Sequence, residues 1–190
     1  MARPITYDPE QALDRAMDLF WSHGYRAVSV DDVVKHTGLN RHSLYAHYGS
    51  KFGLLRAAIT RYLDHVQGFL RGVLDGPGTP RHRLTEMMAF RHPEVKEEFW
   101  KLILLRGCLA MRTAAELRQS HPEIHSALCE FEEDLVQHVA RVVAEGQRSG
   151  DVTSTRPAQT LARIFCAGFM VPASVCPSES RNQAVLSIFD

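Results

Sequence analysis

Residues 29–51, SVDDVVKHTGLNRHSLYAHYGSK, constrain the fold more than any other part of this 190-residue chain. Two short helical patterns flank a turn at residues 37–40, TGLN. The second pattern carries Arg, His, Ser and Tyr side chains, which are suited to contacts with bases and phosphates. This layout predicts a helix-turn-helix whose second helix enters a groove of DNA.

Local signals define the ends of both predicted helices. Ser29 is a suitable cap for the first helix, and Asp32 lies three residues later, at the spacing of a capping box. Gly38 stands where a left-handed stop is expected. Asn40 is a suitable cap for the second helix, which we expect from about Arg41 to Tyr48. The turn therefore has the residues that both of its helices need.

The second helix has an inner and an outer side. Leu44 and Tyr48 lie four residues apart and are placed to face the core, although Tyr48 is equally suited to a phosphate contact. Ser50 is a suitable cap for a third helix, which we expect from Lys51 to about Leu74. A lysine at a helix N-terminus opposes the helix dipole but is well placed to meet a phosphate.

A local charge asymmetry agrees with DNA binding. Residues 33–63 contain five Lys or Arg residues and no Asp or Glu, whereas the whole chain balances 22 basic against 22 acidic residues. A solvated basic face on an ordinary helical hairpin would give the same charge pattern. The caps, the turn and the tyrosines therefore carry the argument, and the charge supports it.

Residues 8–63 resemble the N-terminal domain of the TetR family of transcriptional repressors. The matching motifs are a Gly-Tyr turn after the first helix, a Thr-Gly before the recognition helix, and a Leu-Tyr-x-His-Tyr run followed by Ser-Lys. The residues in these motifs are Phe20, Gly24, Tyr25, Ser29, Thr37, Gly38, Leu44, Tyr45, His47, Tyr48, Ser50 and Lys51. One departure is Phe52, where the family usually has Glu.

The resemblance implies an all-α fold, with an N-terminal three-helix helix-turn-helix domain and a C-terminal helical ligand-binding and dimerisation domain. We expect the DNA-binding domain in residues 1–50, a connecting helix in 51–74 and the regulatory and dimerisation domain in 75–190. The residues predicted to contact operator DNA are Ser29, Thr37, Arg41, His42, Ser43, Tyr45, His47, Tyr48 and Lys51. Arg41 can bond a guanine edge bidentately, which is worth about 1–3 kcal/mol of discrimination.

Beyond a Gly-Pro-rich break at residues 75–80, the pattern predicts five further helices. We expect them near residues 81–91, 94–105, 107–119, 122–148 and 157–173. The resemblance, together with the need for two recognition helices on a palindrome, predicts a homodimer through helices 122–148 and 157–173. Residues 174–190 form either a short closing helix or a loose tail.

The resemblance also implies a pocket for a small-molecule effector in the C-terminal domain. The bulky residues expected to line it are Phe99, Trp100, Ile103, Leu104, Cys108, Met111, Phe165, Phe169 and Met170. Ordinary core packing would explain each of them equally well. Cys108, in a Gly-Cys-Leu run, suggests an alternative redox or electrophile sensor, unless it is an inert buried thiol.

Several other classes of protein have little support in the sequence. It contains no GxSxG, Walker or dinucleotide-glycine motif, so we predict that it is not an enzyme and needs no cofactor. His121, His125 and Cys129 have helical spacing for a metal site, but His121 precedes Pro122 and should lie outside the helix, so we predict no metal. The lack of a long apolar run and of a signal peptide predicts a cytoplasmic protein without a membrane partner.

These observations predict a dimeric regulator, in the first place a repressor, that binds a palindromic double-stranded DNA operator. A small-molecule effector in the C-terminal domain would release it by shifting the helix at residues 51–74. A helical adaptor that has kept the fold but lost DNA binding is the alternative of another class.

Overall fold

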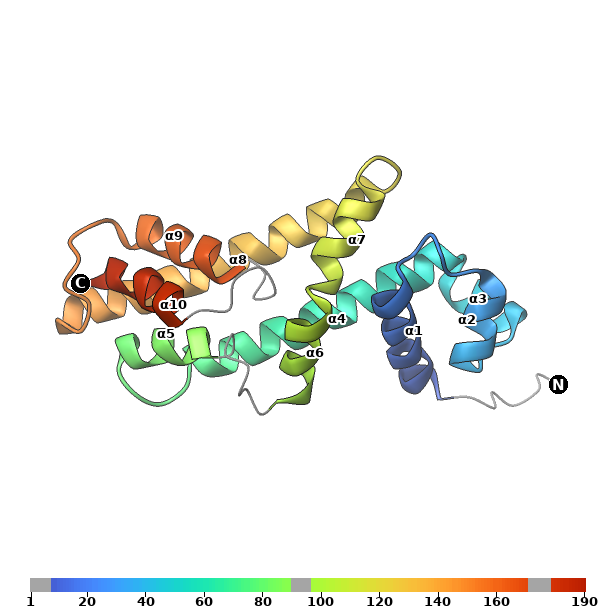
Figure 1. Ribbon diagram of the computed structural model, residues 1–190, viewed down its shortest axis with the longest axis horizontal. Coiled ribbons are helices and arrows are strands. Elements are labelled where there is room, and N and C mark those ends of the chain that lie inside the picture. Colours follow the sequence, from blue (N-terminus) through green and yellow to red (C-terminus); the bar gives the residue numbers. More distant parts are fainter. Residues whose placement is uncertain (1–7, 90–96, 171–178) are drawn as a thin grey trace. The chain divides into compact units, whose positions relative to one another are not determined.

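The computed structural model describes residues 8–89, 97–170 and 179–190, and these residues are largely helical, with no β-strand among them (Figure 1). The helices are α1 (Pro9–His23), α2 (Val30–Thr37), α3 (Arg41–Tyr48), α4 (Lys51–Leu74), α5 (Pro80–Ala89), α6 (Glu98–Arg106), α7 (Leu109–Leu117), α8 (Pro122–Ser149), α9 (Ala158–Met170) and α10 (Glu179–Leu186), followed by a 3-10 helix (Ser187–Phe189). The predicted all-α class is confirmed.

The chain packs as two compact units. The first unit holds the described residues up to Asp64 together with Leu109–Ser126. The second holds His65–Cys108 and Ala127–Asp190, as far as they are described. Compactness thus groups α7 with the N-terminal helices, although it lies far along the chain. The domains predicted at residues 1–50, 51–74 and 75–190 were defined by function. They stay a prediction, because the two units are defined by packing alone.

The core of the first unit is built from apolar faces that the sequence sets at helical spacing. Phe20 and Trp21 near the end of α1 are 2% and 1% exposed, and Leu44 of α3 is fully buried. Trp21 packs edge-on against Tyr62 of α4, with ring centroids 5.2 Å apart, a geometry that aromatic pairs prefer. α1 lies beside α2, and α2 lies beside α3 (Figure 1). Aromatic side chains of α1 and α4 thus form part of the core on which the helix-turn-helix packs.

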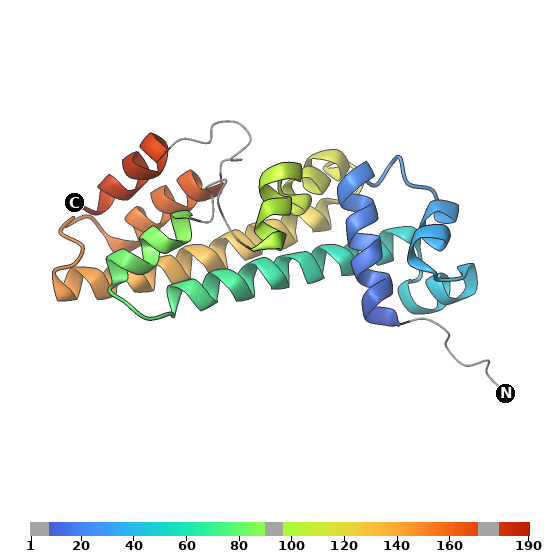
Figure 2. The same ribbon diagram turned by 60° about the horizontal axis from the view of Figure 1, so that its bottom comes forward.

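In the second unit the C-terminal segment is tied down. α10 lies beside α9 and α5 (Figure 2). Phe189 is fully buried and packs against Phe165 of α9, with ring centroids 5.5 Å apart. Its carbonyl oxygen accepts hydrogen bonds from the backbone N–H groups of Thr153 and Ser154 at 2.9 and 3.2 Å. Of the two alternatives for residues 174–190, the described part is therefore a closing helix; residues 174–178 lie outside the described part.

Two helix boundaries differ from the sequence-based expectation. The helix expected at 94–105 begins only at Glu98, because Glu97 has an extended backbone. Residues 94–96 lie outside the described residues, as do the last two residues of the helix expected at 81–91. The helix expected at 107–119 is shorter, Leu109–Leu117. Gly107 has a φ of +79° and donates its N–H to Ile103, so it ends α6 and cannot begin α7.

The other boundaries follow the expectation closely. α4 begins at Lys51 and ends at Leu74, and Ser50 caps it by accepting the N–H of Gly53 at 2.9 Å. α8 begins at Pro122, as predicted, and α9 covers the helix expected at 157–173 up to Met170, beyond which the description stops. Within the described ranges, no helix is long and apolar enough to cross a membrane.

Candidate nucleic-acid interface

The start of α2 has the predicted capping box. The Ser29 side-chain oxygen accepts the N–H of Asp32 at 3.1 Å, and the Asp32 carboxylate accepts the N–H of Ser29 at 2.9 Å. These bonds from the Ser29 hydroxyl and backbone hold the pKa of the Asp32 carboxyl below its usual value. Ser29, one of the predicted DNA contacts, therefore already has a local structural role.

The turn between α2 and α3 is closed by local bonds as well. Gly38 has the left-handed conformation, with φ +77°, and donates its N–H to the Val34 carbonyl. The buried Thr37 hydroxyl donates to the Val33 carbonyl at 2.7 Å and accepts the N–H of Leu39 at 3.2 Å. Thr37 is therefore placed in the core of the turn, where it shapes the approach to α3.

α3 presents one inner and one outer side. Its cap is Asn40, whose side chain accepts the N–H of Ser43 at 2.7 Å. Leu44 is fully buried, as predicted, and Tyr48 is half-buried. The other predicted base or phosphate contacts on this helix are exposed or, for one, partly exposed: Arg41, His42, Tyr45 and His47 are exposed and Ser43 is half-buried. A short, firmly capped helix thus offers a polar and aromatic surface to a partner.

Arg41 has a neighbouring carboxylate in the structure. Its guanidinium lies 2.6 Å from Asp31 of α2, and both side chains are largely exposed. Exposed ion pairs of this kind contribute only about 0.2–1 kcal/mol. The pair with Asp31 therefore holds Arg41 only weakly.

Some of the positive charge in residues 33–63 is paired with carboxylates of the protein itself. Arg61 bonds Asp14 of α1 at 2.6 Å and also bonds Glu10, so that it joins α4 to α1. The hydrogen bond that the Arg61 guanidinium donates to the Asp14 carboxylate raises the pKa of Arg61. Lys35 and Arg56 are exposed. The count of basic residues in the sequence therefore included Arg61, which bonds carboxylates of α1.

Lys51 has partners inside the protein. Its ammonium donates to the backbone carbonyls of Tyr25, at 2.9 Å, and Val28, and lies 4.1 Å from the centre of the Tyr25 ring. Burial lowers the pKa of the Lys51 ammonium, and the charges of Glu116 and Asp32 act in the opposite direction. The predicted phosphate contact stays a prediction, and it would require the ammonium to leave these carbonyls.

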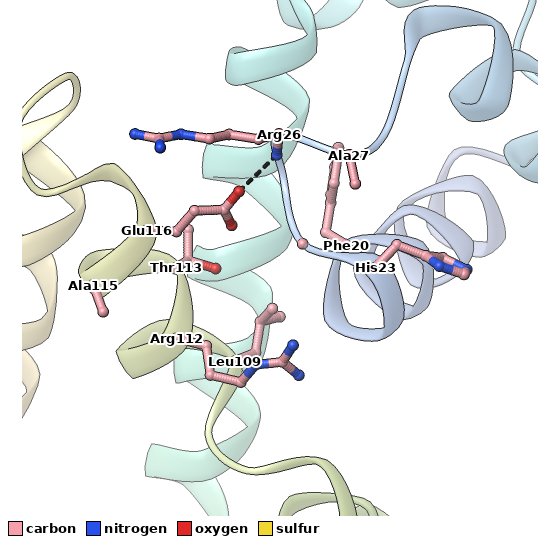
Figure 3. Close-up of a pocket in the computed structure, with 10 residues that line it drawn as sticks. Phe20, His23, Arg26, Ala27, Leu109, Arg112, Thr113, Ala115 and Glu116 are labelled. Atoms are coloured by element: carbon pink, nitrogen blue, oxygen red, sulfur yellow. Dashed lines mark hydrogen bonds between the residues drawn. The ribbon is translucent and has the colours of Figure 1, made fainter.

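Sequence reasoning missed two residues of α7 that bond to α1 and to the loop after it. The Glu116 carboxylate accepts the backbone N–H of Tyr25 at 3.0 Å and that of Arg26 at 2.7 Å, and Figure 3 shows the second of these bonds. Arg112, one turn earlier, donates to the carbonyl of Trp21 at 2.9 Å. About 90 residues separate these partners in the chain, so no local spacing could have indicated them.

A groove of about 460 Å³ lies beside these bonds, between the end of α1 and α7 (Figure 3). It is lined by Phe20, His23, Gly24, Arg26, Ala27, Leu109, Arg112, Thr113, Ala115 and Glu116. None of the residues predicted to bind an effector lines this groove.

The predicted effector residues fall into separate groups. Trp100 packs near Phe169, with ring centroids 6.3 Å apart, and near Phe69 at 5.2 Å. Phe165 packs against Phe189, and Phe99 against His65. The remaining predicted residues, Ile103, Leu104, Cys108, Met111 and Met170, are half-buried. Met111 belongs to the first unit and all the others to the second, so an effector site made of all nine stays a prediction.

The cysteines and histidines differ in their surroundings. Cys166 is buried, which raises the pKa of its thiol to about 12 and makes it a poor nucleophile. Cys108 is half-buried between α6 and α7. His121 lies outside α8, as predicted, and stacks on Phe52 with ring centroids 3.6 Å apart. In the described part of the chain, no group of three or more His, Cys, Asp or Glu side chains could hold a metal ion.

The capped α2, the left-handed turn and the exposed outer side of α3 define a helix-turn-helix protein. The family model of bacterial regulatory proteins of the tetR family matches residues 12–58, and that of the tetracyclin repressor-like C-terminal domain matches residues 80–180. The chain belongs to the TetR family, which confirms the resemblance that the sequence motifs indicated.

Relatives of known name agree with this membership. The transcriptional repressor ComR of Escherichia coli K12 is 50% identical over 62 residues, which are 33% of this chain and 30% of ComR. The regulator YezE of Bacillus subtilis is 28% identical over 129 residues, 65% of this chain and 62% of YezE. The chain thus spans less than two thirds of the length of either relative. Both relatives are transcriptional regulators, in agreement with the prediction that the chain is not an enzyme.

Solved structures show the same fold over the whole chain. A cysteine mutant of the TetR family regulator CifR, complexed with 26-bp double-strand operator DNA, matches with a TM-score of 0.80 and 25% identity over 100% of both chains. The reduced form of NemR from E. coli matches with a TM-score of 0.76 at 16% identity, covering 94% of this chain and 92% of NemR. The second likeness concerns the fold alone.

Proposed function

We propose that this protein is a dimeric transcriptional regulator, in the first place a repressor, that binds a palindromic operator through α3. The observation that carries the proposal is the exposed outer side of a doubly capped α3, with Arg41, His42, Tyr45 and His47. The likeness to CifR, which was solved with operator DNA, supports double-stranded DNA as the partner. A chromosomal operator would place this function in the cytoplasm.

The predicted contacts divide into two kinds. Arg41 reads a guanine edge in the major groove, with His42, Ser43 and His47 as further base or groove contacts. Tyr45, which is 49% exposed, and Tyr48 contact phosphates and fix the register. Ser29 and Thr37 act through the capping box and the turn that hold α3.

A homodimer through α8 and α9 follows from the need to occupy two half-sites. Exposed residues of α9 form a stripe at helical spacing: Thr160, Arg163, Ile164 and Ala167. Ile164 in this stripe is 40% exposed and offers an apolar side chain to a partner helix. Arg163 bonds Glu133 of α8 at 3.0 and 3.1 Å, which joins the two helices of the proposed interface.

A small-molecule effector is the proposed release signal. The aromatic group of Trp100, Phe169 and Phe69 in the second unit supports an apolar or aromatic ligand. The effector must bind the released state more tightly than the DNA-binding state, because equal affinity for both would shift nothing.

A second candidate signal is chemical modification of Cys108. This thiol is half-buried, whereas Cys166 is buried and has a raised pKa. The likeness to CifR, whose matching structure is that of a cysteine mutant, supports a test of this cysteine. Loss of operator binding after treatment with an electrophile, prevented by Cys108→Ser, would distinguish this signal from a non-covalent effector.

The function is tested by selection of DNA duplexes followed by gel-shift titration at two salt concentrations. We expect a sequence-specific complex, weakened about 5- to 150-fold by Arg41→Ala, the loss of one bidentate base contact. Arg148→Ala removes the same charge from the exposed end of α8 and is the matched control. No specific complex at either salt concentration would contradict the proposal and favour a helical adaptor.

A further inference from the structure

The loop of residues 24–28 decides where the helix-turn-helix begins. It joins the end of α1 to Ser29, the cap of α2. Gly24 still donates its N–H to the Phe20 carbonyl at 2.9 Å, which closes α1, but the N–H groups of Tyr25 and Arg26 bond to a side chain from outside the loop. Backbone groups in such a loop need partners from elsewhere. The position of this loop therefore depends on the side chains that bind its N–H and C=O groups.

Two oppositely charged side chains bind this loop. The Glu116 carboxylate accepts the N–H groups of Tyr25 and Arg26, at 3.0 and 2.7 Å. The Lys51 ammonium donates to the carbonyls of Tyr25 and Val28. Each charge is matched to the backbone groups that it meets, since a carboxylate only accepts and an ammonium only donates. We call Glu116 and Lys51 the loop clamp.

The loop clamp is supported by packing on both sides. α7 buries Leu109, Thr113 and Leu117 in the first unit, which fixes the helix that carries Glu116. Arg112 holds the last turn of α1 through the Trp21 carbonyl. Gly24 leaves room for the carboxylate, because a Cβ there would lie 3.1 Å from a Glu116 oxygen and the φ of +79° strains any other residue. Figure 3 shows the Glu116 carboxylate directed at the backbone of Arg26.

We propose that Glu116 and Lys51 are positioning residues for DNA recognition, which hold the loop of residues 24–28 and thereby place α2 and α3 for the operator. The inference rests on the proposed operator binding.

The sign of the Glu116 effect makes the proposal testable. A carboxylate in a DNA-binding unit repels phosphates, so its removal should strengthen binding if it acted only through its charge. If Glu116 positions the loop, Glu116→Gln weakens specific binding, because the two N–H groups meet different carboxylate oxygens and the amide replaces one of these oxygens with a donor NH2 group. The two roles therefore predict opposite changes.

The experiment measures affinity for the selected operator and for a scrambled duplex of equal length, using the full chain. We expect Glu116→Gln to weaken operator binding about tenfold while scrambled-duplex binding stays equal or rises. Glu86→Gln, on the exposed side of α5 and outside the proposed dimer interface, is the matched control. Unchanged operator affinity, or an equal loss on both duplexes, would overturn the proposal, since unfolding lowers both alike.

Lys51→Gln tests the other side of the loop clamp. A phosphate contact contributes about 0.9 to the slope of log affinity against log salt concentration. We expect weaker operator binding with an unchanged slope, whereas the exposed Lys35→Gln is the control for charge alone. A slope reduced by about 0.9 would make Lys51 a phosphate contact and overturn its positioning role.

Amide hydrogen exchange of the free protein separates the clamp from the proposed function. The Tyr25 and Arg26 amides should exchange about tenfold faster in Glu116→Gln than in wild type. Equal exchange would contradict the clamp. Absence of any specific complex for the wild type would instead contradict the proposed operator binding.

Discussion

The helix-turn-helix and the loop before it satisfy their backbones in two different ways. In the helix-turn-helix, Ser29, Asn40 and Gly38 each bond a group within four residues. In the loop of residues 24–28, the partners of four backbone groups are Glu116 and Lys51, from distant helices. The shape of the DNA-binding motif is therefore locally encoded, whereas its placement depends on tertiary contacts.

The largest effect on stability should come from the long-range side of this comparison. Glu116→Ala leaves two loop N–H groups without their charged acceptor, and we expect a loss of about 2 kcal/mol in unfolding free energy. Urea titration followed by circular dichroism measures it. Glu130→Ala should change stability by less than about 0.5 kcal/mol. Equal stabilities of the two variants would show that the loop of residues 24–28 does not depend on its bonds to Glu116.

The turn glycine comes next. Gly38→Ala should cost about 1–2 kcal/mol, because φ is +77° and the cost lies in the backbone and not in a clash. Gly68→Ala, in the interior of α4 with open space around it, should instead stabilise by about 0.5–1 kcal/mol. Glycine-to-alanine substitution should therefore lower the unfolding temperature at position 38 and raise it at position 68. Two changes of the same sign would show that the turn is not held in the left-handed conformation.

The capping box should have a smaller, pH-dependent effect. Ser29→Ala is expected to cost about 1 kcal/mol at neutral pH. The pKa of Asp32 is lowered in the folded state by its bonds to Ser29, so this part of the stability is present above the unfolded pKa and is lost as pH falls through the folded value. The difference between wild type and variant should therefore shrink below about pH 4. A difference that grows on acidification would contradict the capping box.

The smallest effect should come from the exposed ion pair of Asp31 and Arg41. Asp31→Asn should change unfolding free energy by less than about 1 kcal/mol, because both side chains are exposed. The same variant should bind the operator more tightly, since Arg41 no longer has to leave a carboxylate. Weaker operator binding by Asp31→Asn would show that the pair is needed to orient Arg41.

This division also explains what the sequence could predict. The capping box of Ser29 and Asp32, the stop at Gly38 and the limits of α4 were predictable, because each depends on residues close in the chain. The outer side of α3 followed from the spacing of Leu44 and Tyr48.

Other features were not predictable because their causes are distant in sequence. Arg61 counted toward the basic segment and Lys51 was predicted to contact a phosphate. The sequence did not indicate that Asp14 of α1 bonds Arg61 or that carbonyls of the loop accept from Lys51. Glu116 belongs to none of the motifs that the sequence contains. Packing also placed Met111 apart from the other predicted effector residues, a separation that a list of apolar residues cannot reveal.

Methylation protection of guanine N7 on the selected operator tests the central claim most directly, since that atom lies in the major groove where Arg41 is proposed to bind. The wild type should protect guanines placed symmetrically in two half-sites, and Arg41→Ala should lose that protection even at concentrations that restore occupancy. Protection of the same guanines by Arg41→Ala, or no major-groove protection by the wild type, would contradict recognition of DNA through the outer side of α3.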